Sequence, residues 1–466
     1  LGSNARRCGD FIIVELNMKD KKTKKVLIIS YYYPPIPSIA SLRIVKLAKY
    51  VREFGWEPIV ISGDQRTYAG ADEGIELPDV ETYRIRDRFF ELVKTSAHQK
   101  INFKETNSQV YGETSNLLLQ KVIYKILKYL KYLFLEYLLI PDRLVITWKR
   151  DVIKKALEII DTDKPDLILT SHSPATCHII GSFLSRRTGI PWIADYRDLW
   201  SQSHLVQHSS IRHFFEKKLE RCTMKYAKGI VVVAMPAAQK LSVFLNKQVD
   251  VITNGYDPED YKPEKLYSFS KEKISRNKLS FVYTGNVYDG KQNFYLFFNA
   301  VSKLLKNGDV LIEDIEIQFW GTNKELIVSQ ILDDVRDIVI FKQRVPYNEI
   351  TKIQMSASIL LLFTWNVLED KSIYSGKLFE YLGAQRPIFA IPANPGSVVD
   401  DLLRETNAGT LCSNENEIAN QILSWYKEFK KNGNIEFHGI KSEIEKYSRK
   451  EQAKQFAKLF NETINK

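Results

Sequence analysis

The sequence predicts an α/β protein built from two Rossmann-like, doubly wound domains. Two series of short apolar strands alternate with helical segments, and a charged, proline-bearing stretch at 258–278 separates the two series. Such alternation is typical of parallel sheets covered by helices. The chain has 466 residues, of which 44% are hydrophobic and 26% charged. It is therefore long enough for two globular cores.

The first series of strands begins with an apolar run after a basic lead-in. A helix is predicted over 41–54, because Gly55 ends the periodic pattern there. In doubly wound sheets ligands gather at the carboxyl ends of strands, so the polar residues behind these strands are site candidates. The strands are predicted at 26–29, 58–61, 166–170, 192–194, 229–233 and 249–252.

Residues 63–140 are predicted to form an excursion from this first core. The part up to residue 116 is polar and lacks a hydrophobic period, and 117–140 form an apolar helix interrupted by lysines. That helix suits the interface of a membrane, where lysines meet headgroups. A core helix with a lysine edge is the alternative.

The second series of strands leads to the predicted domain limits. Its strands are predicted at 279–283, 316–320, 338–341, 358–363 and 388–391. We expect a helix from Arg449 to pack back on the first domain. The predicted units are a leader at 1–23, an N-terminal domain at 24–265, a C-terminal domain at 266–448 and a returning helix at 449–466.

The charge balance favours an anionic partner. The chain carries 67 Lys and Arg against 56 Asp and Glu, a formal net charge of +11. A nucleic-acid partner is not expected, because an Arg-rich arm, a zinc finger and an RNA-binding sheet signature are all missing. The four cysteines lack metal-ligand spacing, which argues against zinc and for a reducing, cytoplasmic compartment.

The stretch from Ser375 to Ile388 contains the strongest candidate for a ligand site. A small, flexible Ser-Gly pair leads into a helical pattern that places Lys377 and Glu380 one turn apart. The amides of the helix start and the lysine can meet a diphosphate, while the glutamate can accept hydrogen bonds from ribose hydroxyls. An amphipathic helix with a solvated lysine and glutamate is the alternative.

Several short motifs, taken together, resemble those of the GT-B glycosyltransferases, specifically glycosyltransferase family 4 of bacterial polysaccharide assembly. The resemblance extends over nearly the whole chain from Val26 onward. It rests on Tyr33-Pro-Pro35, Asp195-Tyr-Arg-Asp-Leu-Trp200, Asn254-Gly-Tyr-Asp257, Tyr283-Thr-Gly285 and Lys377-Leu-Phe-Glu380 with Gly383 and Pro387 behind it.

This resemblance implies that the C-terminal domain binds a nucleotide-sugar donor without a metal ion or other cofactor. The candidates for contact with the diphosphate are Lys291, Lys377 and the small residues beside them. The segment at Val345 resembles the one that frames the nucleotide base in the family. For the lysine at 291 a solvated loop residue is the alternative, and for the glycine at 285 and the valine at 345 an ordinary turn. The donor-binding candidates are Gly285, Asn286, Lys291, Val345, Ser375, Gly376, Lys377 and Glu380.

One position departs from the family pattern. Glu380 matches the second glutamate of the family's paired-glutamate motif, for which ribose binding is implied. The first glutamate of the pair would fall near Ser372, and this chain lacks it. A branch of the family with a modified motif is therefore expected.

Three acceptor-side candidates follow strands of the first domain. His172 can bond the transferred sugar or the acceptor, or it can be a histidine satisfied in a loop. Asp195 is a candidate base and Arg197 a candidate phosphate contact, with an internal ion-pair cluster as the alternative. The D-x-D pattern at Asp161 and Asp163 is expected to be a capping turn rather than a metal site.

The expected function is retaining transfer of a sugar from a nucleotide sugar to a saccharide acceptor, in surface polysaccharide or glycan synthesis. The basic balance and the 117–140 helix favour a lipid-linked acceptor and a peripheral place on the cytoplasmic membrane face. The alternatives are a sugar-nucleotide epimerase on the same fold and an inactive nucleotide-sugar-binding scaffold, which the missing glutamate supports.

Overall fold

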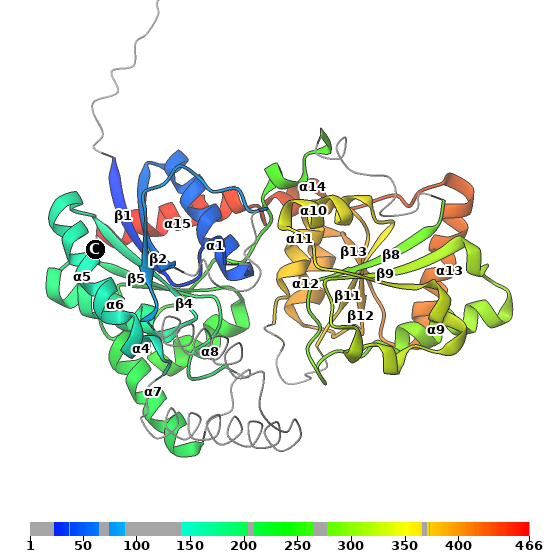
Figure 1. The fold of residues 1–466 in the computed structure, drawn as a ribbon, viewed down its shortest axis with the longest axis horizontal. Helices are drawn as coiled ribbons and strands as arrows, with labels where there is room; N and C mark the ends of the chain where they lie inside the picture. The colour runs from blue at the N-terminus through cyan, green and yellow to red at the C-terminus, as the bar shows by residue number, and fades with distance from the viewer. Residues whose placement is uncertain are drawn as a thin grey trace, which may run out of the picture.

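The computed structural model describes residues 23–36, 38–64, 74–88, 141–203, 209–264, 277–365, 371 and 373–465. Within them the chain forms two α/β units that lie side by side, each on one parallel sheet (Figure 1). The predicted fold class is confirmed. Nearly all of the predicted leader and the whole 117–140 helix lie outside the described residues.

The first sheet has the strand order β3-β2-β1-β4-β5-β6-β7, and its neighbours all pair in parallel. The apolar side chains of β1 are fully buried, because helices cover both faces of the sheet. The strands are β1 Lys24–Ser30, β2 Trp56–Asp64, β3 Thr82–Arg86, β4 Leu167–His172, β5 Trp192–Tyr196, β6 Gly229–Val232 and β7 Asp250–Val251.

Helix α1 illustrates how local sequence sets the element bounds in this domain. The Ser38 side chain accepts a hydrogen bond from the Ala40 amide and caps the helix start. The chain then tightens into a 3-10 turn, Val51–Phe54, which ends at Gly55 in the left-handed conformation. The helices of this domain are α1 Ile39–Tyr50, α4 Leu144–Thr147, α5 Lys149–Asp163, α6 Ala175–Thr188, α7 Ser210–Met224 and α8 Met235–Leu245.

The expectation of an irregular excursion over 63–140 is wrong for β3. Residues Thr82–Arg86 pair with β2 and form the edge of the first sheet. Tyr83 and Ile85 are half-buried against the apolar core, whereas arginines alternate with them, and this mixed pattern conceals the strand in the sequence. In the described part of the chain, we find no helix with the length and apolarity that crossing a bilayer requires.

The second sheet has the order β10-β9-β8-β11-β12-β13, again parallel throughout. Its strands are β8 Leu279–Thr284, β9 Ile315–Trp320, β10 Val339–Lys342, β11 Ile359–Phe363, β12 Ile388–Ile391 and β13 Gly409–Leu411. Its helices are α9 Tyr295–Asn307, α10 Tyr347–Ser356, α11 Gly376–Ala384, α12 Val398–Thr406, α13 Glu415–Asn432 and α14 Lys441–Glu445.

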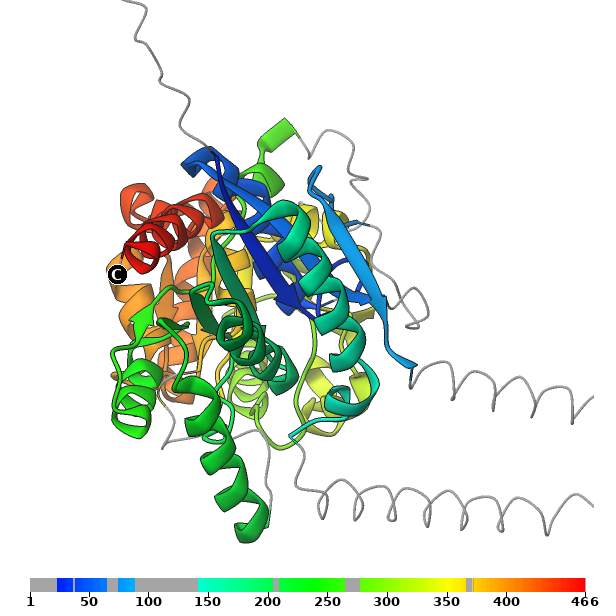
Figure 2. The same ribbon diagram turned by 90° about the vertical axis from the view of Figure 1, so that its left-hand side faces the viewer.

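The last helix, α15 (Arg449–Ile464), belongs in space to the first sheet (Figure 2). Phe456 and Phe460 join the apolar cluster of β1 and α1, and the Phe460 ring lies 5.2 Å from that of Trp56. The chain therefore crosses between the sheets twice. The two crossings run side by side, since the Tyr256 amide donates to the Tyr447 carbonyl and the Arg449 amide to the Tyr256 carbonyl.

Candidate active site

A cavity of about 510 Å³ opens between the two sheets, at the carboxyl ends of their strands. The first domain lines it with Arg197, Asp198 and Leu199, which directly follow β5, and with the start of α1. The second domain lines it with the loop behind β8 and the start of α11. Because both sheets direct strand ends toward this space, it is the natural place for a ligand that bridges the domains.

Lys377, in the first turn of α11, meets the loop behind β8. Its ammonium group donates a hydrogen bond to the Asn286 carbonyl at 3.2 Å and lies 4.8 Å from the centre of the Tyr283 ring. Gly285 has a φ of +89°, and a Cβ there would sit 3.1 Å from Cε of Lys377. A glycine is thus favoured for its backbone angle and for the close approach of the lysine.

The same place collects several groups suited to an anion. Ser375 and Gly376 line the cavity at the start of α11, where helical amide groups lack partners within the helix. With the Lys377 ammonium they form a positively polarised corner of the cavity beside Gly285 and Asn286, which we call the Lys377 corner. Five of the predicted donor-binding residues are therefore brought together, in an arrangement that can neutralise a diphosphate.

Glu380 lies one helical turn beyond this corner and also lines the cavity. It accepts a hydrogen bond from Nε2 of Gln354 at 3.0 Å. Burial raises the pKa of the Glu380 carboxyl, while the Gln354 hydrogen bond and the charge of Lys377 act in the opposite direction. The carboxylate is thus held at a fixed place, one turn from the lysine.

Gln354 is a site residue that the sequence reasoning missed. It is fully buried in α10, donates to Thr284 Oγ1 at 3.1 Å and accepts from the Tyr261 hydroxyl at 2.9 Å. These contacts satisfy both ends of its amide and set the direction in which it meets Glu380. The available signal was its position four residues after Ile350, on the apolar side of the helix.

The two remaining donor-side candidates have different surroundings. Val345 lines the cavity together with Trp320, Gly321 and Arg344. Lys291 is exposed in the turn closed by its amide and the Tyr288 carbonyl, and it is not among the residues around the cavity. In this geometry Lys291 matches the alternative of a solvated loop lysine.

An aromatic pair at the cavity was also missed. Tyr288 and Trp365 both line it, and their ring centres are 5.1 Å apart. Trp365 follows the end of β11 by two positions, which was the available signal. The position near Ser372, where the family's first glutamate would fall, lies outside the described residues.

His172 lies behind the wall of the cavity rather than in it. Its Nδ1 is 2.8 Å from the Asp198 carbonyl oxygen, which can only accept, so this nitrogen carries the proton. Burial lowers the pKa of His172 to about 4. The ring stacks on His178 and Trp200, at 5.4 and 6.2 Å between centres, and is neutral at neutral pH.

Asp195 is fully buried and is not among the residues that line the cavity. Its two oxygens accept hydrogen bonds from Nε and Nη2 of Arg43, at 3.0 and 2.7 Å, and Ser171 donates a third at 3.1 Å. Arg43 also donates to the Thr253 and Ile252 carbonyls. The ion pair of Arg43 and Asp195 joins α1, β5 and the end of β7. It matches the alternative of an internal ion-pair cluster and does not fit an acceptor-side base.

Of the three acceptor-side candidates, only Arg197 lines the cavity. Its Nη2 donates to the Ser173 carbonyl at 2.7 Å, and its guanidinium lies 5.6 Å from the Tyr32 ring. Its Nε has no hydrogen-bond partner among the described residues. Burial lowers the pKa of Arg197, but an arginine remains charged at neutral pH. Among the described residues of the first domain, Arg197 is thus the cation that lines this cavity.

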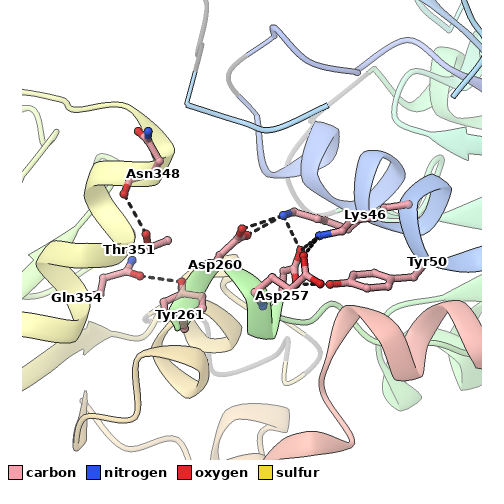
Figure 3. Close-up of polar contacts among 10 residues, drawn as sticks. Lys46, Tyr50, Asp257, Asp260, Tyr261, Asn348, Thr351 and Gln354 are labelled. Carbon is pink, nitrogen blue, oxygen red and sulfur yellow. Dashed lines mark hydrogen bonds and ion pairs between the residues drawn. The ribbon is translucent and has the colours of Figure 1, made fainter. Parts of the chain in front are cut away.

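A polar network fixes the crossing between the two domains (Figure 3). Lys46 of α1 forms ion pairs of 2.6 and 2.8 Å with Asp257 and Asp260, and the Tyr50 hydroxyl donates to Asp257. Burial acts to raise the pKa of Asp257, but Lys46 and these hydrogen bonds outweigh it and lower the pKa to about 2. Tyr261, one residue beyond Asp260, then reaches Gln354 and through it Glu380.

The described residues contain no group of three or more His, Cys, Asp or Glu side chains arranged to hold a metal ion. Asp161 and Asp163 lie in the last turn of α5, and Asp163 pairs with Lys25 at 2.8 Å. Among the described residues, the cationic side chains that line the cavity are Lys377, Arg197 and Arg344.

Comparison with known proteins agrees with this geometry. Residues 131–260 match the family described as Glycosyltransferase Family 4. The chain therefore carries a glycosyltransferase family 4 region on a GT-B fold. Over these residues, the family model confirms the resemblance inferred from the motifs. None of the curated proteins compared with the sequence matches it.

Solved structures place both domains in the same fold. The sucrose-phosphate synthase of Thermosynechococcus elongatus has a TM-score of 0.57 at 12% identity, over 94% of this chain and 98% of its own. A glycosyltransferase from Rickettsia africae has a TM-score of 0.56 at 14% identity, over 95% and 99%. The catalytic domain of Arabidopsis thaliana starch synthase IV, bound to ADP and acarbose, reaches 0.56 at 11% identity, over 95% and 100%.

Proposed function

We propose that this chain transfers a sugar, with retention of anomeric configuration, from a nucleotide sugar held by the second domain to an acceptor held by the first. The Lys377 corner carries the proposal: an ammonium group, a close-approach glycine and a helix start converge in a cavity between two domains. Negative charge that develops on a leaving diphosphate is stabilised by such groups when they are fixed beforehand.

The donor would lie with its diphosphate in this corner and its ribose beside Glu380. A ribose hydroxyl that donates to the Glu380 carboxylate complements the hydrogen bond from Gln354. The base would then lie toward Val345 and Trp320. We propose that Lys377 and the amides neutralise the diphosphate without a metal ion, so turnover should persist in EDTA.

The acceptor would enter from the first domain, where Arg197 offers a cation at the cavity. A saccharide linked to a lipid phosphate or diphosphate is the acceptor class that fits such a group, because a guanidinium binds phosphate through paired hydrogen bonds. With this acceptor, we propose that the reaction occurs on the cytoplasmic face of a membrane, in surface polysaccharide or glycan synthesis. The retaining outcome follows from the family resemblance.

The test is a screen of nucleotide sugars, with and without membrane lipid extract, in which nucleoside diphosphate release and glycosylated products are measured. Lipid-dependent transfer, with the product anomer assigned by NMR, is the expected result. An isomerised donor would instead indicate an epimerase. Tight nucleotide binding without turnover would indicate a scaffold.

A further inference from the structure

Helix α7 projects from the body of the first domain (Figures 1 and 2). Its first two turns expose three large apolar side chains, Ile211 at 69%, Phe214 at 63% and Phe215 at 42%. Single exposed apolar residues are ordinary, but three on one short stretch, two of them aromatic, indicate a surface that meets another phase or partner.

The acidic residues of α7 lie on its buried side, together with Arg212. Both of its carboxylates are buried: Glu216 pairs with Arg212 at 3.3 Å, and Glu220 accepts from the Tyr196 hydroxyl and the Ser201 amide. The basic residues Lys217, Lys218 and Arg221 are half-buried or exposed. The outward charge of the helix is therefore positive.

Helical spacing places these basic residues beside the apolar ones. One broad side of α7 holds Ile211, Phe214, Phe215, Lys217, Lys218 and Arg221, each of them three or four positions from another member of the set. The buried residues Arg212, Glu216 and Glu220 recur at intervals of four on the opposite side. We call the first set the basic-apolar side of α7.

Residues next to α7 are also basic or apolar. The neighbouring helix α6 exposes Phe183, Arg186 and Arg187, and the Arg186 guanidinium lies 4.6 Å from the ring of Tyr226 just behind α7. From residue 199 to residue 249 the sequence contains no acidic residue besides the two buried glutamates of α7. An anionic partner would thus meet no repelling carboxylate from this segment.

We propose that the basic-apolar side of α7 docks this chain on a lipid bilayer with anionic headgroups. Ile211, Phe214 and Phe215 enter the interface between headgroups and acyl chains, and the basic residues contact lipid phosphates. Apolar residues beside Lys and Arg, with no exposed acid between them, are the chemistry of an interfacial helix. This inference deepens the proposed function, since it rests on a lipid-linked acceptor for its purpose.

The docked helix contacts the residues on either side of a segment that lines the cavity. The Glu220 carboxylate accepts from the Tyr196 hydroxyl at 2.9 Å and from the Ser201 amide at 3.0 Å. These two residues flank the cavity-lining segment Arg197–Leu199. Docking through α7 therefore holds the acceptor side of the cavity at a fixed distance from the bilayer, where a lipid-linked saccharide is presented.

The test is cosedimentation of the full chain with vesicles of phosphatidylcholine, with and without phosphatidylglycerol. We expect binding that depends on phosphatidylglycerol and weakens with salt. A Lys217→Gln, Lys218→Gln variant should bind these vesicles roughly 25-fold more weakly, at about fivefold for each charge near the surface. A Phe214→Ser, Phe215→Ser variant should bind at least about tenfold more weakly.

The matched control is Lys427→Gln with Lys431→Gln, which removes two exposed lysines from α13 of the second domain. It should bind as the unmodified chain does. Equal binding by the control and by both α7 variants would overturn the proposal. Failure of the unmodified chain to bind the vesicles would also overturn it. The same holds if the α7 variants bind vesicles normally but lose dimerisation or RNA binding.

Circular dichroism and nucleoside diphosphate binding, measured on every variant, separate the two proposals. Folded α7 variants that bind nucleoside diphosphate normally but leave the vesicles support the docking helix. An unmodified chain that binds vesicles through α7 but neither binds nor turns over nucleotide sugars would refute the proposed function and leave the docking helix standing.

Discussion

The two halves of the cavity differ in how their candidate residues are used. In the second domain, Lys377, Gly285 and Glu380 all line the cavity, where Lys377 bonds the Asn286 carbonyl and Glu380 bonds Gln354. In the first domain, only Arg197 does so, while His172 and Asp195 are buried behind it. A residue at the carboxyl end of a strand can therefore contact a ligand, or it can be buried and hold in place a loop that contacts the ligand.

The difference is sharpest between Asp195 and its neighbour Asp198. Removing the Asp195 carboxylate leaves Arg43 buried and unpaired, so Asp195→Ala should lower the free energy of unfolding by about 3–5 kcal/mol. Urea denaturation measures this loss. Asp198→Ala, an exposed change at the cavity, should stay within about 0.5 kcal/mol. A stable Asp195→Ala protein that has lost only turnover would restore Asp195 as a base.

His172 provides a pH test of the same buried wall. Above pH 6.5, the ordinary pKa of histidine, its imidazole is neutral in both folded and unfolded chains. As the pH falls from 6.5 to about 4, only the unfolded chain takes up this proton, so stability should fall by up to about 3 kcal/mol. His172→Gln should remove this part of the pH dependence. An unchanged slope would show that folded His172 is protonated in this range.

Lys377 tests the donor half. Lys377→Ala should lower donor kcat/KM about 100-fold, because one fixed charge contact to the leaving diphosphate is lost. The free energy of unfolding should hardly change, since this ammonium makes its hydrogen bond at an exposed place. Lys291→Ala is the matched control and should leave kcat/KM within about twofold. Equal losses in the two variants would move the diphosphate toward the 291 loop.

A substitution of Gln354 tests how Glu380 is positioned in the second-domain half of the cavity, and its expected effect is smaller than that of Lys377→Ala. Gln354→Leu removes the hydrogen bond that directs Glu380 and should raise donor KM about tenfold with little change in kcat. The pKa of Glu380 should rise further, because a contact that lowers it is lost, so donor binding should fail at a higher pH than in the unmodified chain. A loss of stability without either change would make Gln354 purely structural.

The sequence predicted the parts of this molecule that depend on neighbours along the chain. The buried strands β11 and β12 are continuous apolar runs, and Lys377 and Glu380 share a helix face because they are three positions apart. The approach of Gly285 to Lys377 followed from topology, since both lie at strand or helix ends on one side of a parallel sheet.

Contacts between distant residues were beyond such reasoning. Arg43 and Asp195 are 152 positions apart, and either residue alone is compatible with catalysis or with bracing. Gln354 sits 26 positions from Glu380 in a helix whose pattern shows only that the glutamine faces inward. The edge strand β3 was not predicted, because its alternating arginines give the segment a polar pattern that is also typical of a loop.

The position of α15 also bears on the order in which this protein matures during synthesis. The last strand of the second sheet, β13, ends at Leu411, before α15 begins at Arg449. The first domain, although translated first, lacks Phe456 and Phe460 for its core until α15 has been translated. Domains generally fold as they emerge, the N-terminal one first. Here the second domain can finish earlier, so a nascent chain halted before α15 would hold a complete donor half beside an unfinished acceptor half.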